Sequence, residues 1–271
     1  MRARGERGVS RARREGGGRR ARAGIPRVSR VALVHGFLGS PADWADVLAH
    51  LTPRVACDCV PLAELGCASV ADAARTLAAQ LERAPCDALV GYSMGGRIAL
   101  ELAATRPELA PRLVLLSAGP GLEDPAERAR RAAEDDARAS ELLRDGLDAF
   151  VDRWYRLALF APFAAHRSFA DARARRVHGD AAFWARCVAG CSPGRAEPRW
   201  SALPALAART VFVAGALDER YAAFAARAGV LAPALRTEIV AGAGHVLPLE
   251  APDACARIIE SVLPRNRANT P

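Results

Sequence analysis

Short apolar runs alternate with longer amphipathic stretches along most of this chain. The short runs are rich in Val, Leu and Ala and fit strands that are buried on both faces of a parallel sheet. They predict strands at residues 31–34, 55–60, 87–91, 113–117, 211–214 and 237–240. The amphipathic stretches repeat apolar residues at spacings of three and four, which predicts helices. These helices fall at residues 42–51, 70–83, 94–106, 219–230 and 253–262.

This alternation predicts an α/β fold, with a mostly parallel central sheet flanked by helices. One segment departs from it, because residues 121–200 are helical, rich in Arg and Ala, and contain no predicted strand. A connection between two strands needs far fewer residues. We therefore expect a helical cap over the carboxyl edge of the sheet, with ordinary crossover helices as the alternative. The predicted parts are a core at 31–120 and 201–265, the cap at 121–200, and tails at 1–30 and 266–271.

Charge is concentrated at the start of the chain. The formal net charge is +8, but residues 1–30 hold 11 arginines against Glu6 and Glu15, and the rest of the chain is close to neutral. This basic, Gly-rich tail has too few apolar residues to fold, so we predict that it is disordered. Nucleic-acid binding would rest on the tail alone, and we do not expect it to be the main function. The chain has no Lys, which excludes catalytic lysine chemistry.

The amino-acid composition narrows the classes of protein that the sequence can represent. The 271 residues are 51% hydrophobic, which suffices for a large core, and no run of 18 apolar residues predicts a membrane span. The seven cysteines form no Cys-x-x-Cys pair, and no His lies at ligand spacing from them. Without an apolar secretion signal, we expect unpaired thiols, a cytoplasmic location and no metal site. The oligomeric state is left open.

The sharpest chemical signal is the sequence Gly91-Tyr92-Ser93-Met94-Gly95. It lies between a predicted strand and a predicted helix, which is the context of the nucleophile elbow in the α/β-hydrolase fold. Glycine on both sides permits a tight turn, so the hydroxyl of Ser93 projects from the end of the strand. Ser93 is therefore the predicted catalytic serine, and it needs a base to activate it.

A base and an acid follow Ser93 in the order that this fold requires. His245 comes after the last predicted strand, and Asp218 comes after the strand at 211–214. We expect the His245 imidazole to take the Ser93 proton and the Asp218 carboxylate to fix the imidazole tautomer. Glu219 is the alternative acid.

Two backbone amides complete the predicted catalytic site. The Gly-containing loop Val34-His35-Gly36-Phe37-Leu38-Gly39 follows the first strand, where α/β-hydrolases place one half of the oxyanion hole. We assign the N–H groups of Phe37 and Met94 as the two donors. They would stabilise negative charge that develops on a substrate oxygen.

Several motifs carry a resemblance to one family over residues 31–265. They are the loop 34–40 with Asp43-Trp44, the elbow with Gly96-Arg97, Gly119-Pro120-Gly121-Leu122 with residues 127–131, and Trp154-Tyr155 with Phe160. Together they resemble the MenH family, the 2-succinyl-6-hydroxy-2,4-cyclohexadiene-1-carboxylate (SHCHC) synthases of menaquinone biosynthesis. One departure is Val60-Pro61-Leu62-Ala63-Glu64, where many relatives have Leu-Pro-Gly-His-Gly.

The resemblance implies a lyase rather than a hydrolase. The family eliminates pyruvate from 2-succinyl-5-enolpyruvyl-6-hydroxy-3-cyclohexene-1-carboxylate, a small polycarboxylate, without a metal or an organic cofactor. Ser93, assisted by His245, would remove the proton next to the succinyl carbonyl. Family arginines that hold the substrate carboxylates match Arg97, Arg131 and Arg176, which fits the bidentate pairing of guanidinium with carboxylate. Tyr92 and Trp154 match further residues of the family's binding pocket.

Two other functions remain open from the residues alone. A hydrolase with the same triad would act on an ester, a thioester or a carbon–carbon bond through Ser93 as nucleophile. A non-catalytic binding protein with the hydrolase fold would need no triad at all, and the complete set of triad residues argues against it.

Overall fold

The computed structural model of this protein describes residues 28–264. The predicted C-terminal tail and all but the last three residues of the predicted basic tail lie outside this range. Six parallel strands form one sheet in the order β2-β1-β3-β4-β5-β6. Their bounds are β1 (Ser29–Val34), β2 (Val55–Val60), β3 (Ala88–Tyr92), β4 (Leu113–Leu116), β5 (Thr210–Gly215) and β6 (Arg236–Val240). All six predicted strands are present, and the predicted α/β class is confirmed.

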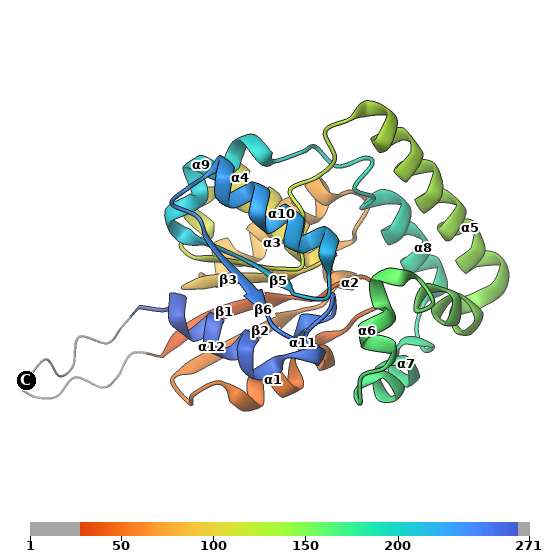
Figure 1. The fold of residues 1–271 in the computed structure, drawn as a ribbon, viewed down its shortest axis with the longest axis horizontal. Helices are drawn as coiled ribbons and strands as arrows, with labels where there is room; N and C mark the ends of the chain where they lie inside the picture. The colour runs from red at the N-terminus through yellow and green to blue at the C-terminus, as the bar shows by residue number, and fades with distance from the viewer. Residues whose placement is uncertain (1–27, 265–271) are drawn as a thin grey trace, which may run out of the picture.

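Helices cover both faces of the sheet (Figure 1). On one face lie α1 (Ala45–His50) and α12 (Pro252–Val262), and on the other lie α3 (Val70–Arg83), α4 (Met94–Thr105) and α10 (Glu219–Leu231). The helix predicted at 42–51 is divided into a 3-10 turn, η1 (Pro41–Trp44), and α1. The Ala45 amide bonds to the Ala42 carbonyl three residues back, which keeps this first turn tighter than an α-helix.

Every regular element in the long segment between β4 and β5 is a helix. It contains α5 (Pro125–Trp154), η3 (Ala158–Phe160), α6 (Ala161–Ala164), α7 (Phe169–Arg176) and α8 (Ala181–Gly190). These helices lie together beyond one end of the sheet (Figure 1). Asp124 caps the start of α5 by accepting from the amides of Ala126 and Glu127. Further short elements are α2 (Leu62–Leu65), η2 (Pro107–Leu109), η4 (Trp200–Ala202), α9 (Leu203–Leu206), η5 (Ala207–Arg209) and α11 (Leu247–Glu250).

Because all six strands run in the same direction, their carboxyl ends meet at one edge of the sheet. The loops that follow β1, β3, β5 and β6 therefore gather there, which is where open α/β sheets bind their ligands. Within residues 28–264, every helix is too short or too polar to cross a bilayer.

Candidate active site

Ser93 occupies a sharp turn between β3 and α4. Its backbone has φ 51° and ψ −110°, a left-handed conformation that is costly for a residue with a side chain. The turn needs glycine at position 95, because a Cβ atom there would collide with the Val34 carbonyl oxygen. The Ser93 amide donates to the Leu116 carbonyl of the neighbouring strand at 2.9 Å. The strain is thus held by the sheet, as in a nucleophile elbow.

The three predicted triad residues lie within hydrogen-bond distance of one another. His245 Nε2 is 3.1 Å from Ser93 Oγ, and His245 Nδ1 is 2.7 Å from Asp218 Oδ2. The other Asp218 oxygen accepts from the Tyr221 amide at 3.2 Å in the first turn of α10. Since a carboxylate only accepts, Nδ1 carries the proton and Nε2 is free to accept the Ser93 hydroxyl. Glu219, the alternative acid, is exposed on α10.

The His245 loop is itself held by a carboxylate. Glu250 accepts from the Gly244 amide at 2.5 Å and from the Val246 amide at 2.7 Å. These two bonds flank His245, whose side chain is buried. The imidazole is therefore fixed from its backbone as well as from Asp218.

The predicted oxyanion donors border the same cavity as the triad serine and histidine. Phe37 and Met94 both line it. Met94 is the first residue of α4, where amide groups have no partner within the helix. In the described part of the chain, no carbonyl accepts from the amide of either residue. Both N–H groups therefore remain available for a substrate oxygen.

Core and cap share the walls of this cavity. From the core, the loops after β1, β3, β5 and β6 supply the triad edge, and from the cap α5, η3 and α8 supply the opposite wall. The lining residues are Phe37, Ser93, Met94, Arg97, Arg131, Asp135, Trp154, Leu159, Phe160, Val188, Cys191, Pro193, Arg220, Tyr221 and His245. Three arginines against one carboxylate, Asp135, give the lining an excess of positive charge.

Arg97 lies one helical turn after Ser93 on α4. Its guanidinium donates to the Cys191 carbonyl at the end of α8, and burial lowers the pKa of the group. Among residues 28–264, no carboxylate forms an ion pair with Arg97. Arg97 is half-buried, and a cation that has lost part of its hydration without gaining a counter-ion is unfavourable, so this guanidinium is suited to receive an anionic group.

Arg131 and Trp154 reach the cavity from the cap. Arg131 bonds to Asp135 through Nε at 2.9 Å. Trp154, the last residue of α5, packs edge-to-face on Phe37 with ring centres 5.2 Å apart. The structure therefore places these two predicted residues in the walls of the cavity that Ser93 and Arg97 also line.

The structure places Arg176 and Tyr92 outside the cavity that Ser93 lines. Arg176 is buried, and its Nη2 donates to Asp43 at 2.8 Å. It lines a different cavity of about 400 Å³, between the loop after β1 and the helices α7 and α8. Tyr92 is buried with its ring 5.7 Å from that of His245, and it does not line the catalytic cavity. Tyr92 therefore packs against the His245 ring, and Arg176 pairs with Asp43, outside the catalytic cavity.

Sequence reasoning missed Asp135 and Arg220, which also line the cavity. A signal existed for each. Arg220 is two residues after Asp218, at the start of α10. Asp135 is four residues after Arg131 on a predicted helix, a spacing that places both on one face.

The described side chains form no cluster that could hold a metal ion. Within residues 28–264, no group of three or more His, Cys, Asp or Glu side chains is arranged to hold a metal ion. All seven cysteines are free thiols. Burial raises the pKa of Cys255 and of Cys86, the latter to about 11, so these thiols are protonated at neutral pH.

The fold and the triad define a class of protein, and comparison with known families agrees. The sequence profile of the Alpha/beta hydrolase family matches residues 31–258. Because the match includes the strands, the triad and the inserted helices, the chain belongs to the α/β-hydrolase family.

Individual relatives give a narrower comparison than the family as a whole. A Serratia proteamaculans protein named 2-succinyl-6-hydroxy-2,4-cyclohexadiene-1-carboxylate synthase is 31% identical over 85% of this chain and 91% of its own length. A Bacillus subtilis protein, which carries the same name with a provisional label, is 31% identical over 86% of this chain and 89% of its own. Among solved structures, MenH from S. aureus matches with a TM-score of 0.78 and 24% identity, over 89% of this chain and 95% of that one. The resemblance carried by the motifs is thereby confirmed.

Proposed function

We propose that this protein is an SHCHC synthase, a carbon–oxygen lyase that eliminates pyruvate from 2-succinyl-5-enolpyruvyl-6-hydroxy-3-cyclohexene-1-carboxylate. One observation carries the proposal: Arg97, with no carboxylate partner among the described residues, shares a cavity with the Ser93–His245 pair. The relatives named for this reaction point to the same substrate. A neutral ester would leave the Arg97 charge without a counter-ion, whereas a polycarboxylate supplies one.

The triad would act as a base in this reaction. His245 Nε2 accepts the proton of Ser93 Oγ, and the resulting alkoxide removes the proton next to the succinyl carbonyl. The enolate oxygen that forms is stabilised by the amides of Phe37 and Met94. As the enolate collapses to the ketone, a double bond forms from the carbon that lost the proton, the existing ring double bond moves one position along the ring, and the bond from the ring to the enolpyruvyl oxygen breaks. The leaving group departs as pyruvate, and its proton comes from the imidazolium of His245 through Ser93.

The arginines would orient the substrate. Guanidinium pairs with carboxylate through two parallel hydrogen bonds, so each pair fixes both the position and the rotation of a carboxylate. Arg97 lies on the Ser93 side of the cavity and Arg131 on the cap side. A substrate with carboxylates at both ends would therefore be held between core and cap, with its ring facing Ser93.

The direct test is pyruvate release from the enolpyruvyl substrate by the purified protein. We expect steady pyruvate formation by the natural chain and loss of at least a thousandfold in kcat for Ser93→Ala. Arg97→Gln should raise KM by about tenfold or more, because hydrogen bonds to charged groups contribute about 1.5–3 kcal/mol. Arg112→Gln is the matched control, since the exposed Arg112 side chain bonds, among residues 28–264, only to the Pro111 carbonyl.

The other functions predict different results. Release of p-nitrophenol from p-nitrophenyl esters without pyruvate formation would make the protein a serine hydrolase and overturn the proposal. Absence of turnover in both assays, with no difference between the natural chain and Ser93→Ala, would instead indicate a binding protein.

A further inference from the structure

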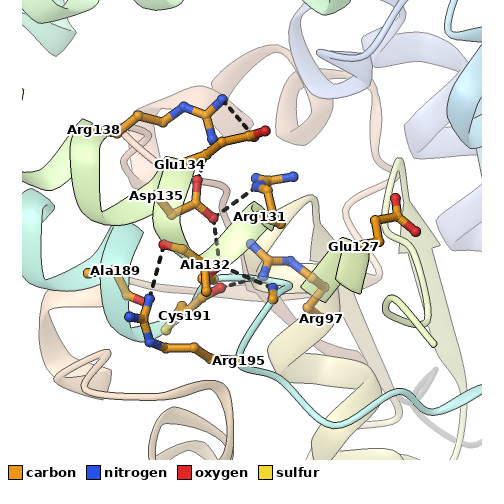
Figure 2. A network of polar contacts seen from close by, with 12 residues as sticks. Arg97, Glu127, Arg131, Ala132, Glu134, Asp135, Arg138, Ala189, Cys191 and Arg195 are labelled. Carbon is orange, nitrogen blue, oxygen red and sulfur yellow. Dashed lines mark hydrogen bonds and ion pairs between the residues drawn. The ribbon is translucent and has the colours of Figure 1, made fainter. Parts of the chain in front are cut away.

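A buried carboxylate forms part of the cap wall of the catalytic cavity. Asp135 lies on α5, and its side chain is only 1% exposed. It accepts hydrogen bonds from Arg131 Nε at 2.9 Å and Arg138 Nη1 at 2.5 Å (Figure 2). A third comes from Ser192 Oγ at 2.7 Å. A buried charge is tolerated only when it is paired and hydrogen-bonded, and these donors meet that condition.

The bond to Asp135 determines which part of Arg131 faces the cavity. Asp135 takes the Nε hydrogen, and among residues 28–264 no acceptor binds the two terminal nitrogens of Arg131. That edge of the guanidinium carries parallel N–H groups that match the two oxygens of a carboxylate. The second arginine, Arg138, is directed by the same carboxylate to a position over the Trp154 ring, at 5.7 Å.

The same carboxylate is connected to Arg97. Ser192, which donates to Asp135, directly follows Cys191, whose carbonyl accepts from Arg97. The Ser192 hydroxyl oxygen also accepts from the Gly194 amide at 3.1 Å, which fixes the turn after α8. Figure 2 shows the bonds that join Arg131 to Asp135 and Arg97 to Cys191.

We propose that Asp135 is the positioning residue of the substrate's carboxylate site. It holds Arg131 with its terminal edge toward the cavity and, through Ser192, keeps the Cys191 carbonyl on Arg97. One carboxylate thereby sets the orientation of both guanidinium groups. This inference rests on the proposed function, because it assigns the binding of a polycarboxylate to that same site.

The direction of the change in KM distinguishes a positioning role of Asp135 from a purely electrostatic effect of its charge. Asp135 is a negative charge in the wall of an anion site, so by Coulomb's law alone its removal would tighten the binding of a carboxylate. If it acts by positioning, its removal releases Arg131 and Arg138 from their geometry and weakens binding. The two possibilities therefore predict opposite changes in KM.

The chain offers a matched control at the next residue. Asp136 is 51% exposed and pairs with Arg195 at 2.7 Å, so Asp136→Asn removes the same charge from the same helix. In the pyruvate assay, we expect Asp135→Asn to raise KM at least tenfold with kcat within about threefold of the natural chain. Asp136→Asn should change KM less than twofold. An unchanged or lower KM for Asp135→Asn would overturn the proposal.

Three further measurements exclude a general structural effect. Labelling of Ser93 by a neutral fluorophosphonate should proceed at the same rate in both variants, because the triad is not altered. Asp135→Asn in an Arg131→Gln background should raise KM only about threefold, since the path through Arg131 is lost and the path through Ser192 to Arg97 remains. If Asp135→Asn does not fold, Ser192→Ala, which keeps every charge, should still raise KM about threefold.

A binding probe keeps this inference separate from the proposed reaction. Benzene-1,3,5-tricarboxylate should slow the labelling of Ser93, and Asp135→Asn should require about ten times more of it than Asp136→Asn. This result would support the role of Asp135 even if the natural chain released no pyruvate. If the two variants required equal concentrations of the tricarboxylate, the proposed role of Asp135 would be overturned, whichever reaction the protein catalyses.

Discussion

The buried ion pair between Asp43 and Arg176 should be among the strongest links between core and cap. Asp43 lies in η1 and is 3% exposed, and Arg176 lies at the end of α7 and is 4% exposed. Asp43 also accepts from Arg175 at 3.1 Å, but that side chain is exposed enough to return to water. The buried Arg176 side chain cannot turn to water in this way. Its Nε and Nη1 have no hydrogen-bond partner within the described residues, so loss of Asp43 would leave its charge unpaired.

We therefore expect Asp43→Asn to destabilise the protein by about 3–5 kcal/mol, the cost of leaving a buried charge unpaired. The Tyr155 and Phe163 rings, 5.5 and 5.8 Å from the Arg176 guanidinium, place the value near the lower end of this range. For a domain of this size, about 3 kcal/mol corresponds to a decrease in Tm of about 6–12 °C. Thermal unfolding followed by circular dichroism measures this decrease directly.

The control is Asp58→Asn, which breaks a pair with Arg30 whose side chains are 59% and 46% exposed. That variant should lose less than about 1 kcal/mol, as exposed pairs do. Adding Arg176→Met to Asp43→Asn should recover most of the Tm, because it removes the unpaired charge. A decrease in Tm for Asp43→Asn no larger than for Asp58→Asn would refute the reasoning.

The catalytic loops allow three further tests. Asp218→Asn should lower kcat about 10³–10⁴-fold in the pyruvate assay, as expected when the imidazole tautomer is lost, whereas an equal loss in Glu219→Gln would contradict the assignment of the acid. Gly95→Ala should lower both Tm and activity, because its Cβ would meet the Val34 carbonyl, while Gly229→Ala on α10 has room and should not. Burial lowers the pKa of His35, so the unfolded chain binds a proton at this residue more readily than the folded chain does. The free energy of unfolding, measured with urea, should therefore decrease as the pH falls below about 6.5, by up to about 1.4 kcal/mol per pH unit. A slope that His35→Gln leaves unchanged would exclude His35 as its source.

Sequence patterns predicted the catalytic loops well because each loop is specified locally. The helix predicted at 70–83 has the bounds observed for α3, and Ser69 caps it by accepting from the Asp72 amide at 3.0 Å. The elbow around Ser93 depends on glycines two and three residues away. Because parallel strands place their following loops at one edge, the strand pattern was enough to predict that Ser93 and His245 meet.

Arginine positions in the cap were less predictable, because neighbours far away in the chain determine them. Arg175 and Arg176 are adjacent and chemically identical, yet one is exposed and the other buried. Both donate to Asp43, far earlier in the chain, but only the Arg176 guanidinium also packs against the Tyr155 and Phe163 rings. A match to family motifs identifies the position of Arg176 but not the direction in which its side chain points.

Asp135 shows that part of this information was present in the helix pattern. It lies four residues before Ala139 and seven before Leu142, both of which contribute to the hydrophobic core. Residues at these spacings share one helix face, so the pattern places a carboxylate within an apolar stripe. Such a carboxylate must have partners, and Arg131 and Arg138 lie on the adjoining turns of the same helix. A charged residue on the apolar face of a cap helix therefore indicates a polar network at the site that the helix covers.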